Sequence, residues 1–355
     1  MWLNEMLFHS LAKHVFCSGS FAYYMQNITD LLLKSPLPPS SPVSDYWNNI
    51  GDMKNWGWEF NIKSINIDRP LRKFKWTTDV NFTTNDTKVE SLIDQVGSSV
   101  TRGYSNAGTI IMEDTRLWCY YMAEFAYLDE EHGVDMIYEI DQDKWENEGI
   151  VEKTGNVIPA TQTNMAENKV IHEDKTPFPR YYGGLSNRVE YRGFDFNFRF
   201  YYAGGHYIYD YVEQRATHVG TGDNMLISDL VDNSWTEDNK DAKYPRLTWN
   251  YKYDWEMDEN YNWVQSQGNV NYNNKSTQYS RYLYKGDYLR LKSLELGYTI
   301  KSDLISNMNI NRLRIYFNAT NLFTWAFHYD GWDPETGSTN LPPVRTFNVG
   351  VNLGF

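Results

Sequence analysis

The last nine residues of the chain, Phe347-Asn348-Val349-Gly350-Val351-Asn352-Leu353-Gly354-Phe355, decide the fold. Every odd position is apolar, and every even position is Asn or Gly. Because successive side chains of a β-strand point to opposite faces, this alternation predicts a strand with one apolar face and one small, polar face. A sheet of such strands needs lipid or a second protein layer against its apolar face.

Several upstream segments alternate in the same way. Residues 313–320 carry apolar side chains at odd positions, and residues 294–300 carry them at even positions. Two further pairs of segments predict hairpins, one across the tight turn Arg192-Gly193 and one around Asp68-Arg69-Pro70. With three more segments added, we count about ten strands and no amphipathic helix of comparable length. The three added segments are residues 19–33, 46–54 and 116–128.

The connections between these segments are of two kinds. Some are short turns, whereas residues 129–180, 205–287 and 324–344 are long polar stretches. Loops of that length are unusual in compact soluble domains, but outer-membrane barrels combine short periplasmic turns with long extracellular loops. We therefore predict an all-β fold, an antiparallel transmembrane β-barrel with long extracellular loops. Residues 87–115 are the exception, and they predict either a long periplasmic connection or a displaced strand.

Composition supports this class and excludes others. Aromatic residues make up 16% of the chain, with 28 Tyr, 17 Phe and 13 Trp, and such rings suit strands and membrane interfaces. No run approaches the roughly 18 apolar residues that a membrane helix needs. The net charge of −13 argues against nucleic-acid binding. Cys17 and Cys119 have no metal spacing, and without a histidine motif or a glycine-rich phosphate loop we predict no cofactor.

The residues also resemble a known family. Tyr288-Leu289-Arg290-Leu291-Lys292-Ser293-Leu294-Glu295-Leu296-Gly297-Tyr298 resembles the YLRLKNLTLGY strand of the SusC/RagA family of TonB-dependent transporters. The region after Tyr120 departs from that family, so the resemblance does not imply the shape of the loop there. The other segments that resemble the family, in the same order, are residues 29–33, 49–59, 182–187, 314–323, 331–335 and 343–347.

This resemblance implies an architecture, a barrel of about 22 strands around an N-terminal plug. The chain would supply about the last ten strands of that barrel. Residues 15–355 are then the C-terminal segment of the barrel, without the plug and the TonB-contacting segment. Residues 1–14 match the family poorly and lack the features of a secretion signal, and we interpret them as a truncation scar.

The function implied by the resemblance is transport, with no enzymatic step. The protein would import oligomeric nutrients, glycans or peptides, across the bacterial outer membrane. A SusD-like lipoprotein would close over the extracellular loops, and the TonB complex would pull on the plug. The barrel-assembly machinery and the outer-membrane lipid are the other expected partners.

Two sets of residues are candidate functional sites. The closing strand is expected to be the signal that the barrel-assembly machinery reads, and the alternative is an ordinary amphipathic strand; its residues are Phe347, Val349, Val351, Leu353 and Phe355. Loop tryptophans could contact ligand or the lid lipoprotein. The alternative is that Trp325 and Trp332 belong to the interfacial aromatic girdle and that the others pack their own loops. The loop candidates are Trp235, Trp249, Trp255, Trp263, Trp325 and Trp332.

Carboxylates in the loops do not make a convincing catalytic or metal site. Asp333 with Glu335, and Asp254 with Glu256, have the residue types that glycoside hydrolysis uses, but nothing nearby in the sequence would fix their separation. Residues 129–139 resemble a calcium loop superficially, yet their carboxylates miss the EF-hand spacing. We therefore predict no catalytic residues and no metal ligands.

A second function class shares this composition. A secreted soluble protein that binds or cleaves glycans would also be aromatic, acidic and rich in strands. Such a sandwich would bury its apolar face against a second sheet, and its loops would be mostly short. The long polar stretches and the apolar face that continues through many strands favour the barrel.

Overall fold

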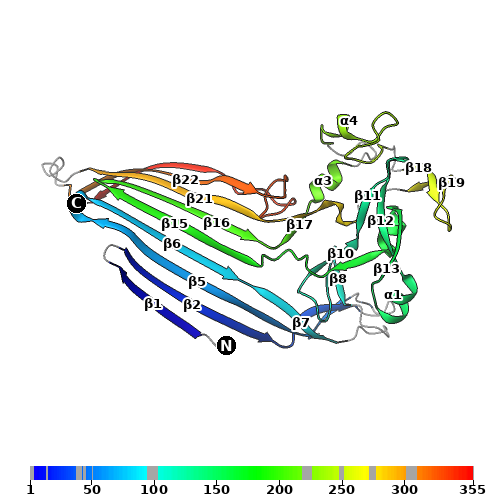
Figure 1. Cartoon of the computed structure of the whole chain (residues 1–355), viewed down its shortest axis with the longest axis horizontal. Helices are drawn as coiled ribbons and strands as arrows, with labels where there is room; N and C mark the ends of the chain where they lie inside the picture. Colours follow the sequence, from blue (N-terminus) through cyan, green and yellow to red (C-terminus); the bar gives the residue numbers. More distant parts are fainter. Residues whose placement is uncertain are drawn as a thin grey trace.

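The computed structural model describes residues 4–12, 15–36, 42, 45–49, 51–93, 103–217, 226–247, 252–271, 277–300 and 310–354. Its main feature is a curved antiparallel sheet, which we call the wall, with a cap at one end (Figure 1). The all-β antiparallel fold is confirmed. The wall strands pair in the order β1 (Asn4–Ala12), β2 (Val15–Ile28), β5 (Gly51–Arg69), β6 (Phe74–Thr84), β15 (Tyr181–Tyr191), β16 (Phe194–Gly204), β21 (Tyr288–Ile300), β22 (Arg312–Ala326) and β23 (Thr346–Gly354).

Short turns and long connections lie at opposite ends of the wall. Arg192 and Gly193 join β15 to β16 with φ values of 49° and 98°, as a two-residue hairpin with both φ positive requires. A 3-10 turn, η1 (Pro70–Arg72), joins β5 to β6 at the same end. The cap lies at the other end, where the connections from β6 to β15 and from β16 to β21 begin (Figure 1).

Residues 87–115 fitted no regular direction in the sequence, and those that the structure describes, residues 87–93 and 103–115, lie at the cap end. Strand β7 (Asp86–Leu92) turns back and pairs with the first residues of β5. The next strands, β8 (Tyr104–Asn106) and β9 (Thr109–Ile111), lie in the cap. Of the two alternatives, the pairing of β7 with β5 supports the displaced strand.

The two faces of the wall differ along whole rows of paired residues. Paired residues of an antiparallel sheet point to the same side, so a row of partners shows the chemistry of one face. One row is apolar and consists of Val189, Phe196, Leu296, Phe317 and Val349. The neighbouring row is polar, consists of Arg188, Asn197, Glu295, Asn318 and Asn348, and its first four residues border a hollow of about 610 Å³.

A β-bulge keeps these faces consistent along β21. Leu291 pairs with Phe200 and Ser293 pairs with Arg199, so Lys292 is an extra residue with no partner in β16. Strict alternation would put Arg290 and Glu295 on opposite faces. The extra residue shifts the alternation by one, and both side chains then share the polar face.

The cap has a core of its own and is not a set of structureless loops. Its centre holds Tyr120, Met122, Ile137, Tyr279 and Tyr282, all at most 7% exposed. Residues 116–128, expected as a wall strand, form two cap strands, so that expectation is wrong. The cap elements are β8, β9, β10 (Cys119–Ala123), β11 (Phe125–Leu128), β12 (Asp135–Ile140), α1 (Gln142–Glu148), β13 (Lys153–Pro159), α2 (Gln162–Glu167), β14 (Lys169–His172), β17 (Tyr207–Tyr209), α3 (Tyr211–Ala216), α4 (Leu230–Asn233), β18 (Lys252–Met257), β19 (Trp263–Asn271), η3 (Ser280–Tyr282) and β20 (Leu283–Lys285).

A separate hairpin connects β2 to β5. Its strands are β3 (Leu32–Pro36) and β4 (Asp45–Asn49). Over the residues that the structure describes, no helix has the length and apolar character needed to cross a membrane.

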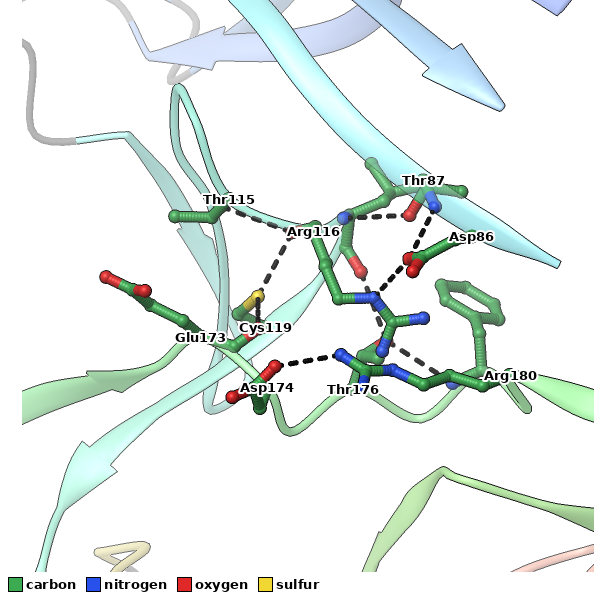
Figure 2. A network of polar contacts seen from close by, with 11 residues as sticks. Asp86, Thr87, Thr115, Arg116, Cys119, Glu173, Asp174, Thr176 and Arg180 are labelled. Atoms are coloured by element: carbon green, nitrogen blue, oxygen red, sulfur yellow. Dashed lines mark hydrogen bonds and ion pairs between the residues drawn. The ribbon is translucent and has the colours of Figure 1, made fainter. Parts of the chain in front are cut away.

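Polar contacts attach the cap to the rim of the wall (Figure 2). The Arg116 Nε donates to the Asp86 carboxylate at 2.6 Å, and the Arg180 guanidinium donates to Asp174 at 2.8 Å. The backbone N–H of Asn85, just after β6, donates to the carbonyl oxygen of Arg180 at 2.8 Å. The Asn85–Arg180 hydrogen bond joins the start and the end of the same long connection, and the two ion pairs hold residues beside it, so the cap is fixed at its base.

Candidate functional site

A pocket of about 390 Å³ lies where the wall meets the cap. Tyrosines dominate its lining, and three prolines and a short polar segment complete it. Pockets of this size with aromatic walls and a few polar groups are typical small-ligand sites. The tyrosines are Tyr120, Tyr201, Tyr207, Tyr209, Tyr211 and Tyr288.

The alternation of β16 places two lining residues on the polar face of the wall. Tyr201 and Ala203 share the face of Asn197, and they pair with Arg290 and Tyr288 of β21. Beyond the end of β16, strand β17 pairs with β20 and carries Tyr207 and Tyr209 into the pocket. The pocket is therefore continuous with the polar face, not with the apolar face.

Helix α3 forms another part of the pocket wall. Its N-cap residue Asp210 accepts hydrogen bonds from the backbone N–H groups of Val212 and Glu213 at 3.0 and 2.9 Å. Tyr211 opens the helix, and its hydroxyl accepts a hydrogen bond from Gln278 at 2.8 Å. Burial raises the pKa of Tyr211, and it raises the pKa of Tyr209 further, so both hydroxyls stay protonated at neutral pH.

Residues 331–339, which we call the strap, close one side of the pocket. Arg290 is fully buried and donates to Asp333 at 2.5 Å and to Glu335 at 2.6 Å. At the far end of the strap, the Ser338 hydroxyl accepts from the Tyr211 N–H at 2.9 Å and donates to the Tyr209 carbonyl oxygen at 3.2 Å. The strap is thus anchored to β21 at one end and to β17 and α3 at the other.

This arrangement also explains the two carboxylates considered for glycoside hydrolysis. Asp333 and Glu335 both accept from one guanidinium, and Asp333 also caps the turn of the strap by accepting from the Glu335 N–H at 2.9 Å. Asp254 and Glu256 lie on strand β18 at the edge of the cap. Anchoring the strap is therefore the role that the contacts of Asp333 and Glu335 support.

His206 is a buried polar residue in the lining of the pocket. It is 4% exposed, and its Nε2 lies 3.4 Å from the carbonyl oxygen of Pro334, while its Nδ1 has no hydrogen-bond partner among the described residues. Burial lowers the pKa of His206, so the imidazole is neutral at pH 7. A neutral ring that donates from Nε2 presents a bare acceptor at Nδ1.

The loop tryptophans lie in several different places, and none of those described lines the pocket. Trp235 is 4% exposed and donates from its indole N–H to the Glu130 carbonyl oxygen, which is a packing role inside the cap. Trp255 and Trp263 lie on either strand of the β18–β19 hairpin beside His132, whose ring stacks on Trp263 at 4.2 Å. Trp325 and Trp332 are exposed, and Trp249 lies outside the described residues.

The closing strand β23 has the alternation that its sequence predicts. Val349, Val351 and Leu353 pair with Phe317, Ile315 and Leu313 and are all more than half exposed. Phe347 pairs with Ala319 on the same face, and Phe355 lies outside the described residues. The apolar face of the wall therefore continues to its last described strand.

Sequence reasoning missed the tyrosine pocket although a signal for it was present. The alternation of residues 194–202 places Tyr201 opposite in face to the phenylalanines, and Tyr207, Tyr209 and Tyr211 follow at a spacing of two. The part that no local pattern could supply is the approach of the strap, because it depends on Arg290, more than forty residues away in the sequence.

Comparison with known proteins finds similarity to TonB-dependent receptors. No family model matches the chain. Two TonB-dependent receptors of Formosa agariphila, P3 and P39, are 28% and 27% identical to it over 95% and 94% of its length. TonB-dependent receptor SusC of Bacteroides thetaiotaomicron is 24% identical over 95% of the chain. The chain spans about a third of these relatives, covering 32%, 33% and 30% of their lengths.

Solved structures show the same fold. The structure of the RagAB peptide transporter matches with a TM-score of 0.72 at 24% identity, over 96% of this chain and 33% of the matched chain. The RagAB peptide importer in the closed-closed state matches with a TM-score of 0.71 over 96% of this chain. The chain is thus similar to TonB-dependent receptors, SusC among them, over about a third of their length, and it shares the fold of the matched part of the RagAB structures.

Proposed function

We propose that the protein acts in the uptake of oligomeric nutrients, glycans or peptides, across the bacterial outer membrane, and that this chain supplies the C-terminal barrel wall. The observation that carries the proposal is the pair of unlike faces, an apolar row beside a polar row through five consecutive strands. An apolar band facing lipid and a polar lumen are what a membrane barrel needs. The relatives are receptors and transporters, which supports transport over catalysis.

The proposal includes partners and a division of the chain. A SusD-like lipoprotein would close over the cap, and the exposed rings of Trp255, Trp325 and Trp332 are the candidates for contact with it or with ligand. The TonB complex would power uptake through a plug that accompanies the wall. Residues 15–355 would form the barrel segment, and residues 1–14 would be a truncation scar. Strand β1, which lies in residues 1–14, nevertheless pairs with β2.

Assembly of the wall would depend on the barrel-assembly machinery. Phe347, Val349, Val351, Leu353 and Phe355 are proposed as the signal, because the apolar side chains of β23 share one exposed face. Deleting Phe355 from the full-length protein should lower the amount of heat-modifiable barrel in the outer membrane. An unchanged amount would leave the strand with a structural role only.

Uptake itself is tested by deletion of the gene and complementation. Cells lacking the full-length protein should stop growing on one class of oligomer, glycan or peptide, while growth on the corresponding monomer is unchanged. The protein should fractionate with the outer membrane. A soluble, secreted protein that binds or cleaves glycans would instead appear in the culture medium, and its loss would not depend on TonB.

A further inference from the structure

We propose that the edge of β23 away from β22 pairs, in the full-length protein, with an antiparallel strand from outside this chain, and that the Tyr316 hydroxyl donates to a backbone carbonyl oxygen of that strand. This hydrogen bond would fix the register between the two strands. The proposal deepens the proposed barrel function and rests on it, because it states how the wall joins the rest of the barrel. A repeated arrangement of a tyrosine, a glycine and a carbonyl oxygen carries it.

The first example of this arrangement spans three neighbouring strands of the wall. Tyr202 of β16 pairs with Gly183 of β15 and lies over it, so that a β-carbon on this glycine would collide with the tyrosine hydroxyl. The hydroxyl thereby reaches the third strand, β6, and donates to the Asn81 carbonyl oxygen at 3.1 Å. Asn81 directly precedes Phe82, which is the β6 partner of Gly183. The glycine leaves room for the ring, and the ring connects two strands that are not neighbours.

A second example repeats this geometry in another part of the wall. Tyr24 of β2 pairs with Gly57 of β5 and lies over it in the same way. Its hydroxyl donates to the Asn85 side chain at 2.6 Å and to the Thr84 carbonyl oxygen of β6 at 3.3 Å. The register of β5 with β6 and β7 places Asn85 opposite Gly57. The accepting carbonyl again belongs to the residue just before the one opposite the glycine.

The third example, at the end of the wall, is incomplete. Tyr316 of β22 pairs with Gly350 of β23 and lies over it, so that a β-carbon on Gly350 would collide with the tyrosine ring and hydroxyl. In the described part of the chain, β23 pairs only with β22, and the Tyr316 hydroxyl makes no hydrogen bond there. The ring therefore crosses the outermost strand and carries a hydrogen-bond donor to its free edge.

The two complete examples indicate what would fill this edge. In both, the acceptor lies on an antiparallel strand beyond the glycine, one residue before the glycine's partner. A strand paired with β23 in this way would present the same oxygen to Tyr316, and it would satisfy the N–H and C=O groups along the free edge. A strand of the same polypeptide is the favoured occupant, because the chain covers only 32% of the length of a relative that it matches.

The test uses the purified full-length protein, unfolded with urea from phospholipid vesicles. Tyr316→Phe removes the hydroxyl and keeps the ring over Gly350, so the unfolding equilibrium constant should rise about two- to tenfold, as expected for one lost hydrogen bond. Tyr202→Phe, which loses the bond to Asn81, should show a rise of similar size. The control is Tyr298→Phe, because the Tyr298 hydroxyl makes no hydrogen bond with the described residues, and its unfolding constant should not change.

Amide hydrogen exchange of the unchanged full-length protein tests the edge without any variant. Successive residues of an antiparallel strand direct their N–H groups to opposite neighbours. A free edge would therefore leave every second amide of residues 347–353 unprotected. Pairing on both sides should protect all of them.

Three results would overturn the proposal: an unchanged unfolding constant in Tyr316→Phe, unprotected alternate amides in β23, or protection that is lost when the protein is diluted. The last result would assign the edge to a second copy of the protein. A failure of the uptake function looks different. In that case the unfolding constants and the amide protection are as expected in the purified protein, but deletion of the gene leaves growth on oligomers unchanged.

Discussion

The wall and the cap are held together in different ways. The wall has few buried side chains, and its order comes from backbone pairing and from rows of alternating residues. The cap has a compact core in which Asp135 is buried and bound by both Arg281 and Tyr279. A sheet whose apolar face is covered by lipid needs no protein core of its own, whereas a cap in water does. Substitutions should therefore act through different physics in the two regions.

The largest effect is expected at Arg290, a wall residue that holds the strap through Asp333 and Glu335. Arg290→Met in the full-length protein leaves Asp333 buried without its partner, and removing one member of a buried ion pair typically costs about 3–5 kcal/mol. Lys292→Met is the matched control, because Lys292 is 44% exposed and 3.7 Å from Glu335, so its pair contributes at most about 1 kcal/mol. Thermal unfolding in detergent measures both variants. Equal losses of stability in the two variants would show that the ion pairs of Arg290 do not hold the strap.

The next effect separates the two faces of the wall. Val351→Arg puts a charge on the face proposed to meet lipid, at a cost of about 2–4 kcal/mol near the bilayer midplane. Asn352→Arg, one residue later, places the same side chain on the polar face beside Arg314 and should cost much less. The measurement is the fraction of heat-modifiable protein in outer-membrane vesicles, which should be lower for Val351→Arg than for Asn352→Arg. Equal fractions would mean that the faces are not lipid and lumen.

A third prediction is confined to the cap and depends on pH. Burial lowers the pKa of His172 to about 4, so the folded cap holds this ring neutral while the unfolded chain protonates it near pH 6.5. The contribution of His172 is therefore present above pH 6.5 and is lost as pH falls towards 4, amounting to about 3 kcal/mol at most. The protection factors of the β10 and β14 amides, which compare their hydrogen exchange with the intrinsic rate at each pH, should fall over that range.

His172→Leu tests the cause of this pH dependence. The variant has no titrating ring, so the protection factors of the β10 and β14 amides should vary less between pH 7 and pH 4 than in the unchanged protein. Exchange of the wall strands should not respond to the substitution. A cap that loosens equally with and without His172 would assign the pH dependence to other groups.

The smallest effect concerns a single hydroxyl in the cap core. The Tyr279 hydroxyl donates to Asp135 at 2.5 Å, and a hydrogen bond to a charged group contributes about 1.5–3 kcal/mol. Tyr279→Phe should lower the stability of the cap by that amount and leave the heat-modifiable barrel intact. Tyr261→Phe is the exposed control, since Tyr261 donates to Glu139 at the surface. Loss of the barrel itself in Tyr279→Phe would contradict two separately stabilised regions.

The sequence predicted the wall well because its signals are local. The period-two alternation of residues 347–353 and the turn at Arg192-Gly193 each depend on a few neighbouring residues, and both agree with the structure. The cap was not predicted because its strands are short and its core joins distant segments. Tyr120 and Tyr282, for example, lie in one cluster. Residues 116–128 look like one strand, yet they divide between two cap sheets.

The candidate sites were also predicted only in part. The loop tryptophans were chosen for their large rings, but Trp235 packs inside the cap. The pocket instead gathers tyrosines that alternate locally and a strap whose position depends on a long-range ion pair. Alternation predicts which face a side chain takes, and it cannot predict which loop comes to cover that face.

The bulge at Lys292 determines which residues of β21, the odd-numbered or the even-numbered ones, lie on each face of the wall. Ahead of the bulge the even-numbered residues lie on the polar face, and after it the odd-numbered residues do, as Arg290 and Glu295 show. An insertion or deletion of an odd number of residues on one side of Lys292 would therefore exchange the polar and apolar faces of the part of β21 beyond it, whereas an even number would keep them. Deleting Lys292 itself is the shortest such change, since the loss of a single residue would turn Arg290 to the apolar face and release the strap.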